Sequence, residues 1–261
     1  MELLEGKTAL VAGVANERSI AFGIARQLHA HGARVGLSYA SETLKRRVEP
    51  LAEKIDAPFA QLCDVTDDGD IAALSDRAAA DLGHVDVLVH AVAYARREDL
   101  KGAFADTSRE GFHIAMDVSV YSLIALTRAM LPLMSSGASV ITVTYYGGEK
   151  VAANYNVMGV AKAALESATR YLAADLGPSG IRVNAISAGP IKTLSAAGVS
   201  GFKDVYDEFP RYAPLRRHVE ADDVGRAAVW LAGDLSRNTT GDVLFVDAGY
   251  NILAGPMQER S

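Results

Sequence analysis

The chain contains one cysteine, Cys63, and no apolar run of the ~18 residues that a membrane-spanning helix needs. A single thiol forms neither a disulfide framework nor a thiolate cluster for zinc. The 6 histidines are scattered, and the one close pair is spaced i, i+2, which turns the rings to different faces of a helix. The sequence therefore predicts no metal site, no disulfide scaffold and no membrane span.

Basic residues are also in the minority, with 26 Lys and Arg against 32 Asp and Glu and a net charge of −6. This balance argues against general binding to nucleic acid or anionic membranes, so an acidic partner would need a local basic patch. The first residues, MELLEGKTALVAG, show no basic leader followed by an apolar core. We expect a soluble cytoplasmic protein, because a reducing compartment also suits a lone cysteine.

Short β-branched runs alternate with longer helical stretches along the whole chain. The runs are apolar throughout, as expected for parallel strands whose two faces are both covered by helices. The pattern predicts an α/β fold, a Rossmann-like doubly wound parallel sheet of about seven strands in one domain, 1–261, with ligands at the carboxyl ends of the strands. The runs are 8–13, 33–39, 58–65, 85–93, 138–145, 181–189 and 242–249.

A long stretch after the sixth run, at about 190–215, has no clear periodicity. It contains Gly198, Gly201, Pro210 and Pro214, which favour irregular structure. Long loops at the carboxyl ends of strands often carry function. We therefore predict a mobile substrate-binding flap at about 190–215.

The segment LVAGVANERSIAFGIA follows the first strand and opens a helix, where amide groups can bind a dinucleotide pyrophosphate. Gly13 permits a tight turn, Ser19 and Ile20 begin the helix, and the Ser19 hydroxyl can cap the helix or donate to a phosphate. A serine-capped turn without a ligand is the alternative. Asp64 and Val65 end the third strand, where a carboxylate can take an adenine amino group; taken singly, Asp64 is an ordinary turn aspartate.

Tyr155 and Lys162 lie seven residues apart in an alanine-rich segment predicted to be helical from Asn156, so they share one face about two turns apart. Tyr145 and Tyr146 close the run SVITVT, and only one of them can point toward Tyr155 because neighbouring strand residues face opposite ways. The segment NAISAGPIKT after the sixth strand offers a cradle for nicotinamide and phosphate, formed by Gly189, Pro190, Ile191 and Thr193.

Together these motifs resemble the short-chain dehydrogenases/reductases, and specifically the divergent branch of bacterial enoyl-acyl carrier protein reductases. The resemblance runs over almost the whole chain. It is carried by Gly13-x5-Ser19-Ile20-Ala21, Asp64-Val65, Tyr145-x9-Tyr155-x6-Lys162 and the run RYLAADLGPSGIRVNAISAGPIKTL.

The resemblance implies reduction of the double bond of enoyl-acyl carrier protein thioesters by NADH in fatty acid biosynthesis. Tyr155 is then the donor that stabilises the enolate, Lys162 holds the nicotinamide ribose, and Tyr145 is a second pocket tyrosine. Val92 is predicted beside the cofactor, and Ala95, Met158, Ala196 and Phe202 along the acyl chain. A homotetramer is also implied, and the helix after Tyr155 has so little polar surface that a subunit interface is expected there.

The residues after the second strand, SYASETLKRR, bear on the choice between NADH and NADPH. An arginine directly after the strand is missing and Glu42 would repel a 2′-phosphate, so NADH is expected and NADPH is less favoured. An acidic carrier protein would dock on basic residues near the flap, and the candidates are Lys203, Arg211, Arg216 and Arg217.

Two other functions stay open at the level of sequence. The first is an ordinary carbonyl or alcohol reductase, in which the Thr142 hydroxyl would assist Tyr155; Asp117 stands where that branch has a relay asparagine, which counts against it. The second is a dinucleotide-binding regulatory protein without turnover, against which Tyr155 and Lys162 argue.

Overall fold

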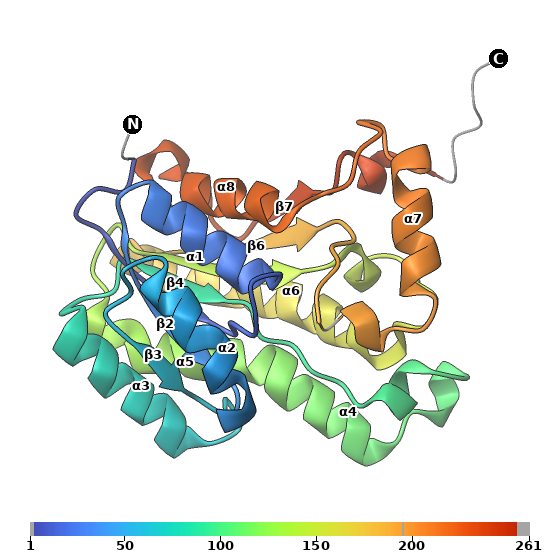
Figure 1. Cartoon of the computed structure of the whole chain (residues 1–261), viewed down its shortest axis with the longest axis horizontal. Helices are drawn as coiled ribbons and strands as arrows, with labels where there is room; N and C mark the ends of the chain where they lie inside the picture. The colour runs from blue at the N-terminus through green and yellow to red at the C-terminus, as the bar shows by residue number, and fades with distance from the viewer. Residues whose placement is uncertain (1–2, 195, 255–261) are drawn as a thin grey trace.

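The computed structural model describes residues 3–194 and 196–254, in which seven strands form one parallel sheet in the order β3-β2-β1-β4-β5-β6-β7 (Figure 1). Each strand lies inside one of the runs predicted from the sequence, so the predicted doubly wound sheet is confirmed. The predicted domain limits, residues 1 and 261, and residue 195 of the predicted flap lie outside the described residues. The strands are β1 Thr8–Ala12, β2 Arg34–Tyr39, β3 Ala60–Leu62, β4 Val87–His90, β5 Ser139–Thr144, β6 Arg182–Ala188 and β7 Val243–Val246.

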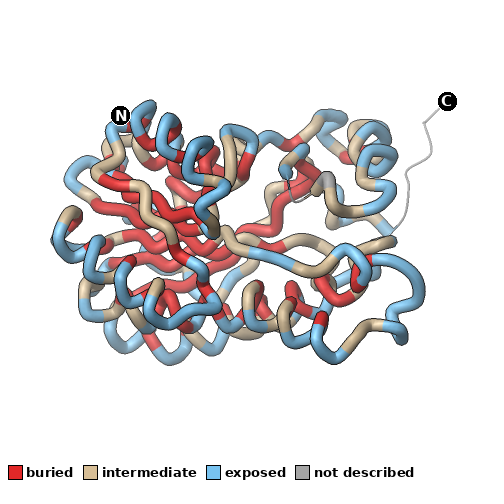
Figure 2. Tube along the Cα trace, turned by 60° about the horizontal axis from the view of Figure 1, so that its bottom comes forward, coloured by how far each residue is buried: buried red, intermediate tan, exposed pale blue. Residues whose placement is uncertain are grey.

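Helices cover both faces of the sheet (Figure 1). Side chains alternate along each strand, so on β5 Ile141 joins the core under α1, α2 and α8, whereas Val140 joins the core under α3, α5 and α6. β1, β4 and β6 are buried along their whole length, as the continuous apolar runs require (Figure 2). The helices are α1 Ile20–Ala30, α2 Glu42–Glu53, α3 Asp68–Asp81, α5 Ser122–Met130, α6 Asn156–Leu176 and α8 Ala221–Ala232.

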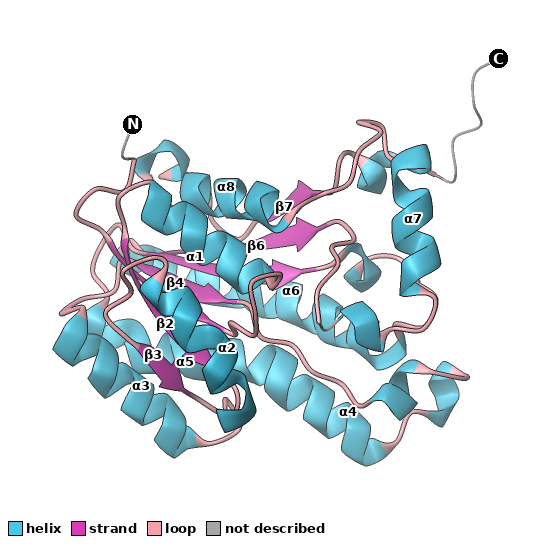
Figure 3. Ribbon diagram, in the orientation of Figure 1, coloured by secondary structure: helices cyan, strands magenta, loops and turns pink. Residues whose placement is uncertain are grey.

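Two further helices, α4 Arg109–Met116 and α7 Phe202–Tyr212, stand beyond the carboxyl ends of the strands (Figure 3). The stretch 190–215 was expected to be irregular, and this expectation is wrong for 202–212. Phe202, Tyr206 and Phe209 follow the i, i+4, i+7 spacing of an apolar helix face, and Phe209 is buried. Pro210 lies inside α7, where it cannot donate a hydrogen bond to the carbonyl four residues earlier, and the helix ends two residues later at Tyr212.

Short 3₁₀ turns connect these elements. They are η1 Arg97–Leu100, η2 Phe104–Asp106, η4 Leu131–Leu133, η5 Tyr146–Gly148, η6 Gly177–Ser179, η7 Ala196–Gly198, η8 Asp234–Ser236 and η9 Tyr250–Ile252.

One helical stretch, Arg109–Leu133, runs from α4 through the π-helical segment η3, Asp117–Tyr121, into α5. By length and composition it is apolar enough to cross a membrane, but 50% of its most apolar window is buried inside the protein. Leu123 and Leu126 of α5 are fully buried among residues that pack on the sheet. The α5 part of the stretch therefore packs on the sheet as a core helix does.

Candidate active site

Two tyrosine rings meet where β5 ends and α6 begins. Tyr145 continues the extended backbone of β5, and Tyr155 occupies the N-cap position of α6. Their ring centroids lie 5.0 Å apart with an interplanar angle of 71°, an edge-to-face contact. Burial raises the pKa of both phenols, so both stay protonated at neutral pH and can donate hydrogen bonds.

Tyr146 points the other way, as predicted for the neighbour of Tyr145. Its ring contacts Phe245 of β7 and Tyr250, with centroid distances of 6.3 and 6.1 Å. Its hydroxyl donates to the carbonyl of Asn251 at 3.5 Å. Tyr146 is therefore a packing residue, and Tyr145 alone of the two faces Tyr155.

Lys162 lies on α6, two turns after Tyr155, with only 5% of its surface exposed. Its Nζ donates to the carbonyl of Val143 on β5 at 2.7 Å. Burial lowers the pKa of Lys162 to about 8, against the opposing field of Glu166. An ammonium has three donors. The Nζ donors that the bond to Val143 does not use can donate hydrogen bonds to the two hydroxyls of a ribose, so Lys162 fits a nicotinamide nucleotide.

A buried histidine lies on the same face of the sheet, and sequence reasoning missed its role. His90 of β4 is paired in register with Thr142 of β5, and its Nδ1 lies 2.8 Å from Thr142 Oγ1. Its Nε2 lies 2.7 Å from Ser122 Oγ, which donates to the Val118 carbonyl. The Thr142 hydroxyl also lies 3.2 Å from the His90 carbonyl, to which it can donate, so both ring nitrogens have a hydroxyl partner with the proton on either one. Burial, followed by the charge of Lys162, lowers the pKa of His90 to about 3, so the ring is neutral.

Thr142 therefore does not assist Tyr155 as it would in an ordinary carbonyl reductase. Its side chain is fully buried and its hydroxyl is engaged with the His90 ring. The register of two adjacent strands produces this contact, and no local sequence motif marks it.

The loop after β1 has the geometry of a phosphate-binding turn. Gly13 has φ +97°, and a Cβ there would clash with the Ala91 carbonyl and lie 3.1 Å from Val92 Cγ2. Ser19 caps α1 through a hydrogen bond from the Phe22 amide at 3.3 Å, as the sequence predicted. The first amides of a helix have no partner within the helix and attract anions. The turn at Gly13, the start of α1 and Val92 therefore fit a dinucleotide.

Asp64 and Val65 follow β3, with Asp64 exposed and Val65 buried. Asp64 Oδ1 accepts hydrogen bonds from the Thr66 amide at 3.0 Å and hydroxyl at 2.8 Å. The carboxylate therefore stabilises a turn, and its contact with an adenine stays a prediction.

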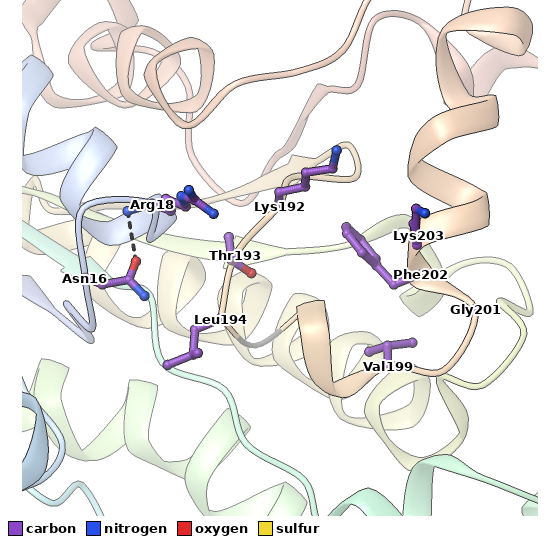
Figure 4. A pocket seen from close by; sticks show the side chains of 9 residues that line it. All are labelled: Asn16, Arg18, Lys192, Thr193, Leu194, Val199, Gly201, Phe202 and Lys203. Carbon is purple, nitrogen blue, oxygen red and sulfur yellow. Dashed lines mark hydrogen bonds between the residues drawn. The ribbon is translucent and has the colours of Figure 1, made fainter.

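A cavity of about 490 Å³ opens between the loop after β1, the segment after β6 and the start of α7 (Figure 4). Thr193 belongs to its wall, and its hydroxyl also accepts a hydrogen bond from the Ala196 amide at 3.1 Å. Ile191 is buried in the core beside it. The cavity is lined by Asn16, Arg18, Lys192, Thr193, Leu194, Val199, Gly201, Phe202 and Lys203.

The residues predicted to contact the acyl chain are divided between this cavity and the core. Phe202 lines the cavity. Met158 is buried and its sulfur receives a hydrogen bond from Ser119 at 3.8 Å, while Ala95 and Tyr155 pack against the same core cluster. Their contacts with substrate stay predictions.

Fold and site together define a class of protein: a dinucleotide-binding oxidoreductase of the short-chain dehydrogenase/reductase type. A family model described as enoyl-(acyl carrier protein) reductase matches residues 13–251, and the chain belongs to this family.

Named relatives cover nearly the whole chain. The NADH-dependent enoyl-acyl-carrier-protein reductase of Bacillus cereus is 50% identical over 255 residues, 97% of this chain and 100% of that one. A crystal structure of the Bacillus cereus reductase with NADP⁺ and an indole naphthyridinone has a TM-score of 0.95 and 50% identity, covering 98% of this chain and 100% of that chain. The reductase of Anaplasma phagocytophilum with NAD has a TM-score of 0.93 at 44% identity, covering 99% of this chain and 97% of that chain.

Proposed function

We propose that this chain reduces the trans-2 double bond of enoyl-acyl carrier protein thioesters with NADH, in the elongation steps of fatty acid biosynthesis. The observation that carries the proposal is the pairing of the Tyr145 and Tyr155 rings beside the buried Lys162. The relatives of Bacillus cereus and Aquifex aeolicus, both named NADH-dependent reductases of this kind at 50% identity, support it.

Bound NADH would supply a hydride for C3 of the enoyl thioester, and negative charge would then develop on the thioester oxygen. Tyr155 donates a hydrogen bond to that oxygen, because burial keeps its phenol protonated. A well-aimed donor of this kind stabilises a transition state by roughly 3 to 4 kcal/mol. Tyr145, in edge-to-face contact with Tyr155, flanks the thioester. Tyr145, Tyr155 and water are the candidates to protonate C2 of the enolate.

Lys162 holds the nicotinamide ribose through the donors that its bond to Val143 leaves over, and its charge adds a positive field beside the developing enolate. The amides at the start of α1 bind the pyrophosphate. The remaining cofactor contacts that we propose come from Gly13, Ser19, Ile20, Asp64, Val65, Val92, Ile191 and Thr193.

NADH is favoured over NADPH by Glu42, the first residue of α2, which follows closely after β2. A carboxylate at this place repels a 2′-phosphate and tolerates a free ribose hydroxyl. Because the Bacillus cereus structure contains NADP⁺, activity with both nucleotides is worth measuring.

The stretch 190–215 acts as the substrate-binding flap in this proposal, with α7 as its helical part. Phe202 and Ala196 on this flap, together with Ala95 and Met158, line the acyl chain in this proposal. The cavity of about 490 Å³ between the flap and the loop after β1 supports it, because one wall belongs to each.

The active form is a cytoplasmic homotetramer in this proposal. Apolar side chains on the outer faces of neighbouring helices support it, since a second copy would cover them. They are Phe112, Tyr121 and Ile124 on the Arg109–Leu133 stretch and Val160 and Tyr171 on α6, with exposed fractions between 36% and 78%.

Tyr155→Phe tests the function and the assigned donor together. NADH oxidation is followed with crotonyl and longer trans-2-enoyl thioesters, beside acetoacetyl thioester and NADPH. We expect enoyl-dependent oxidation by the wild type and a loss of about a hundredfold or more in the variant. Turnover of the ketoacyl thioester alone would indicate a carbonyl reductase, and NADH binding without turnover a regulatory protein.

A further inference from the structure

A second charged side chain of α6 is buried beside Lys162. Glu166 lies one turn further along the helix and has only 6% of its surface exposed. A buried carboxylate is costly unless it is hydrogen-bonded or paired with a charge. Burial raises the pKa of Glu166, and the hydrogen bond from Thr144 opposes that rise.

The last two residues of β5 hold both α6 side chains. The Val143 carbonyl accepts a hydrogen bond from Lys162 Nζ at 2.7 Å, and the next residue, Thr144, donates its hydroxyl to Glu166 Oε1 at 2.7 Å. Tyr145 follows directly in the sequence. The strand end that carries one pocket tyrosine therefore also fixes α6, which carries Tyr155.

The η5 turn, which follows Tyr145, lies close to the carboxylate of Glu166. A Cβ on Gly148 would lie 2.9 Å from Glu166 Oε1 and 3.0 Å from the Ala163 amide, so this turn approaches α6 closely. Glu166 therefore contacts the strand end and the turn while lying one helical turn from Lys162.

Among the charges around Lys162, the carboxylate of Glu166 is the one whose field favours the protonated form of Lys162. His90 of β4 is neutral, and the field of Glu166 opposes the effect of burial on the pKa of Lys162. Glu166 itself faces Lys162, Arg170 of α6 and the exposed Glu149 after η5.

We propose that Glu166 is a positioning residue that keeps Lys162 protonated and in place against β5. Lys162 can then keep its hydrogen bonds to the hydroxyls of the nicotinamide ribose. The role rests on the proposed function but is measurable without turnover. Glu166 acts through Lys162 and touches neither cofactor nor substrate in this proposal.

The test is the pH dependence of NADH affinity, measured by nucleotide fluorescence on wild type, Glu166→Gln and Glu166→Asp. NADH affinity should fall at alkaline pH as Lys162 loses its proton. In Glu166→Gln, which lacks the neighbouring negative charge, the midpoint, the pH at which half of this loss has occurred, should be about one pH unit lower than in the wild type. Its affinity then falls about tenfold more than that of the wild type above about pH 8, and the two remain within about twofold near pH 6. Glu166→Asp, which keeps the charge, should restore the midpoint.

Glu149→Gln is the matched control, because it removes an equal charge near the same turn from an exposed residue. An unchanged midpoint in Glu166→Gln, or an equal shift in Glu149→Gln, would overturn the proposal. Glu166→Ala replaces Glu166→Gln if that variant does not fold. Wild-type protein that binds NADH with this pH dependence but reduces no enoyl thioester would contradict the proposed function and leave the role of Glu166 intact.

Discussion

Gly147, in the η5 turn, lies against the rings of Tyr145 and Tyr155. A Cβ at this position would lie 2.7 Å from Tyr155 Cδ1, closer than real side chains pack, and 3.0 Å from Tyr145 Cδ1, which is a tight contact. Both rings would have to move to admit a methyl group. The position of the proposed donor therefore depends on the absence of a side chain at residue 147.

Gly147→Ala should lower kcat/KM with an enoyl thioester by about a hundredfold, the cost of displacing a catalytic group by about 1 Å. Overpacking should lower the free energy of unfolding by about 1 to 3 kcal/mol. Steady-state kinetics and denaturant unfolding measure the two effects. Gly177→Ala is the control, since nothing lies within 4 Å of its added Cβ. Wild-type kinetics in Gly147→Ala would show that the rings do not need this approach.

For single residues, the sequence predicted correctly the relative positions of side chains that lie on the same helix or the same strand. Tyr155 and Lys162 are brought to one face by helix geometry alone, and the alternation of a strand separates Tyr145 from Tyr146. His90 and Glu166 depend instead on how β4, β5 and α6 pack together. No spacing in the chain encodes that packing, so both roles became visible only in the structure.

Among the elements, the strands were easier to predict than the structure of the stretch 190–215. Short apolar β-branched runs that alternate with helical stretches are typical of buried parallel strands. In 190–215 the glycines and prolines suggested a loop, yet Gly201 immediately precedes α7 and Pro210 lies in its last turn. The apolar spacing of Phe202, Tyr206 and Phe209 was the available signal for this helix.

The outer face of α6 tests the proposed assembly. Val160 and Tyr171 lie eleven residues apart, about three turns, and therefore on one face, with exposed fractions of 37% and 78%. Val160→Glu would place a charge within a face that the proposed assembly covers, which is unfavourable without a partner. We expect smaller species than in the wild type by sedimentation velocity.

Val205→Glu is the matched control, because Val205 is 50% exposed on α7, away from α6. It should sediment like the wild type. If Val160→Glu kept the wild-type assembly, the outer face of α6 would not be the interface.

For the whole molecule, the net charge of −6 opposes long-range attraction of an acidic carrier protein. Composition gives this total but not its distribution in space. The structure places Arg18, Lys192 and Lys203 around the cavity that the stretch 190–215 partly lines, although Lys192 also contacts Asp207 at 3.8 Å and the Tyr206 ring. Three basic side chains therefore gather at this cavity on an acidic protein, although α7 also carries Asp204, Asp207 and Glu208.

Lys203→Glu should raise KM for an enoyl-acyl carrier protein by about five- to tenfold with little change in kcat, because a charge at the rim of an interface acts mainly on encounter. The effect should shrink as salt is added. KM for a neutral enoyl thioester of N-acetylcysteamine should stay unchanged, because that substrate carries no acidic protein. Lys45→Glu on α2 makes the same change of charge at another exposed site. Two results would show that Lys203 does not guide the carrier to the flap. One is an equal rise in KM for the carrier-protein substrate in Lys203→Glu and Lys45→Glu, and the other is an equal rise in KM for both substrates in Lys203→Glu.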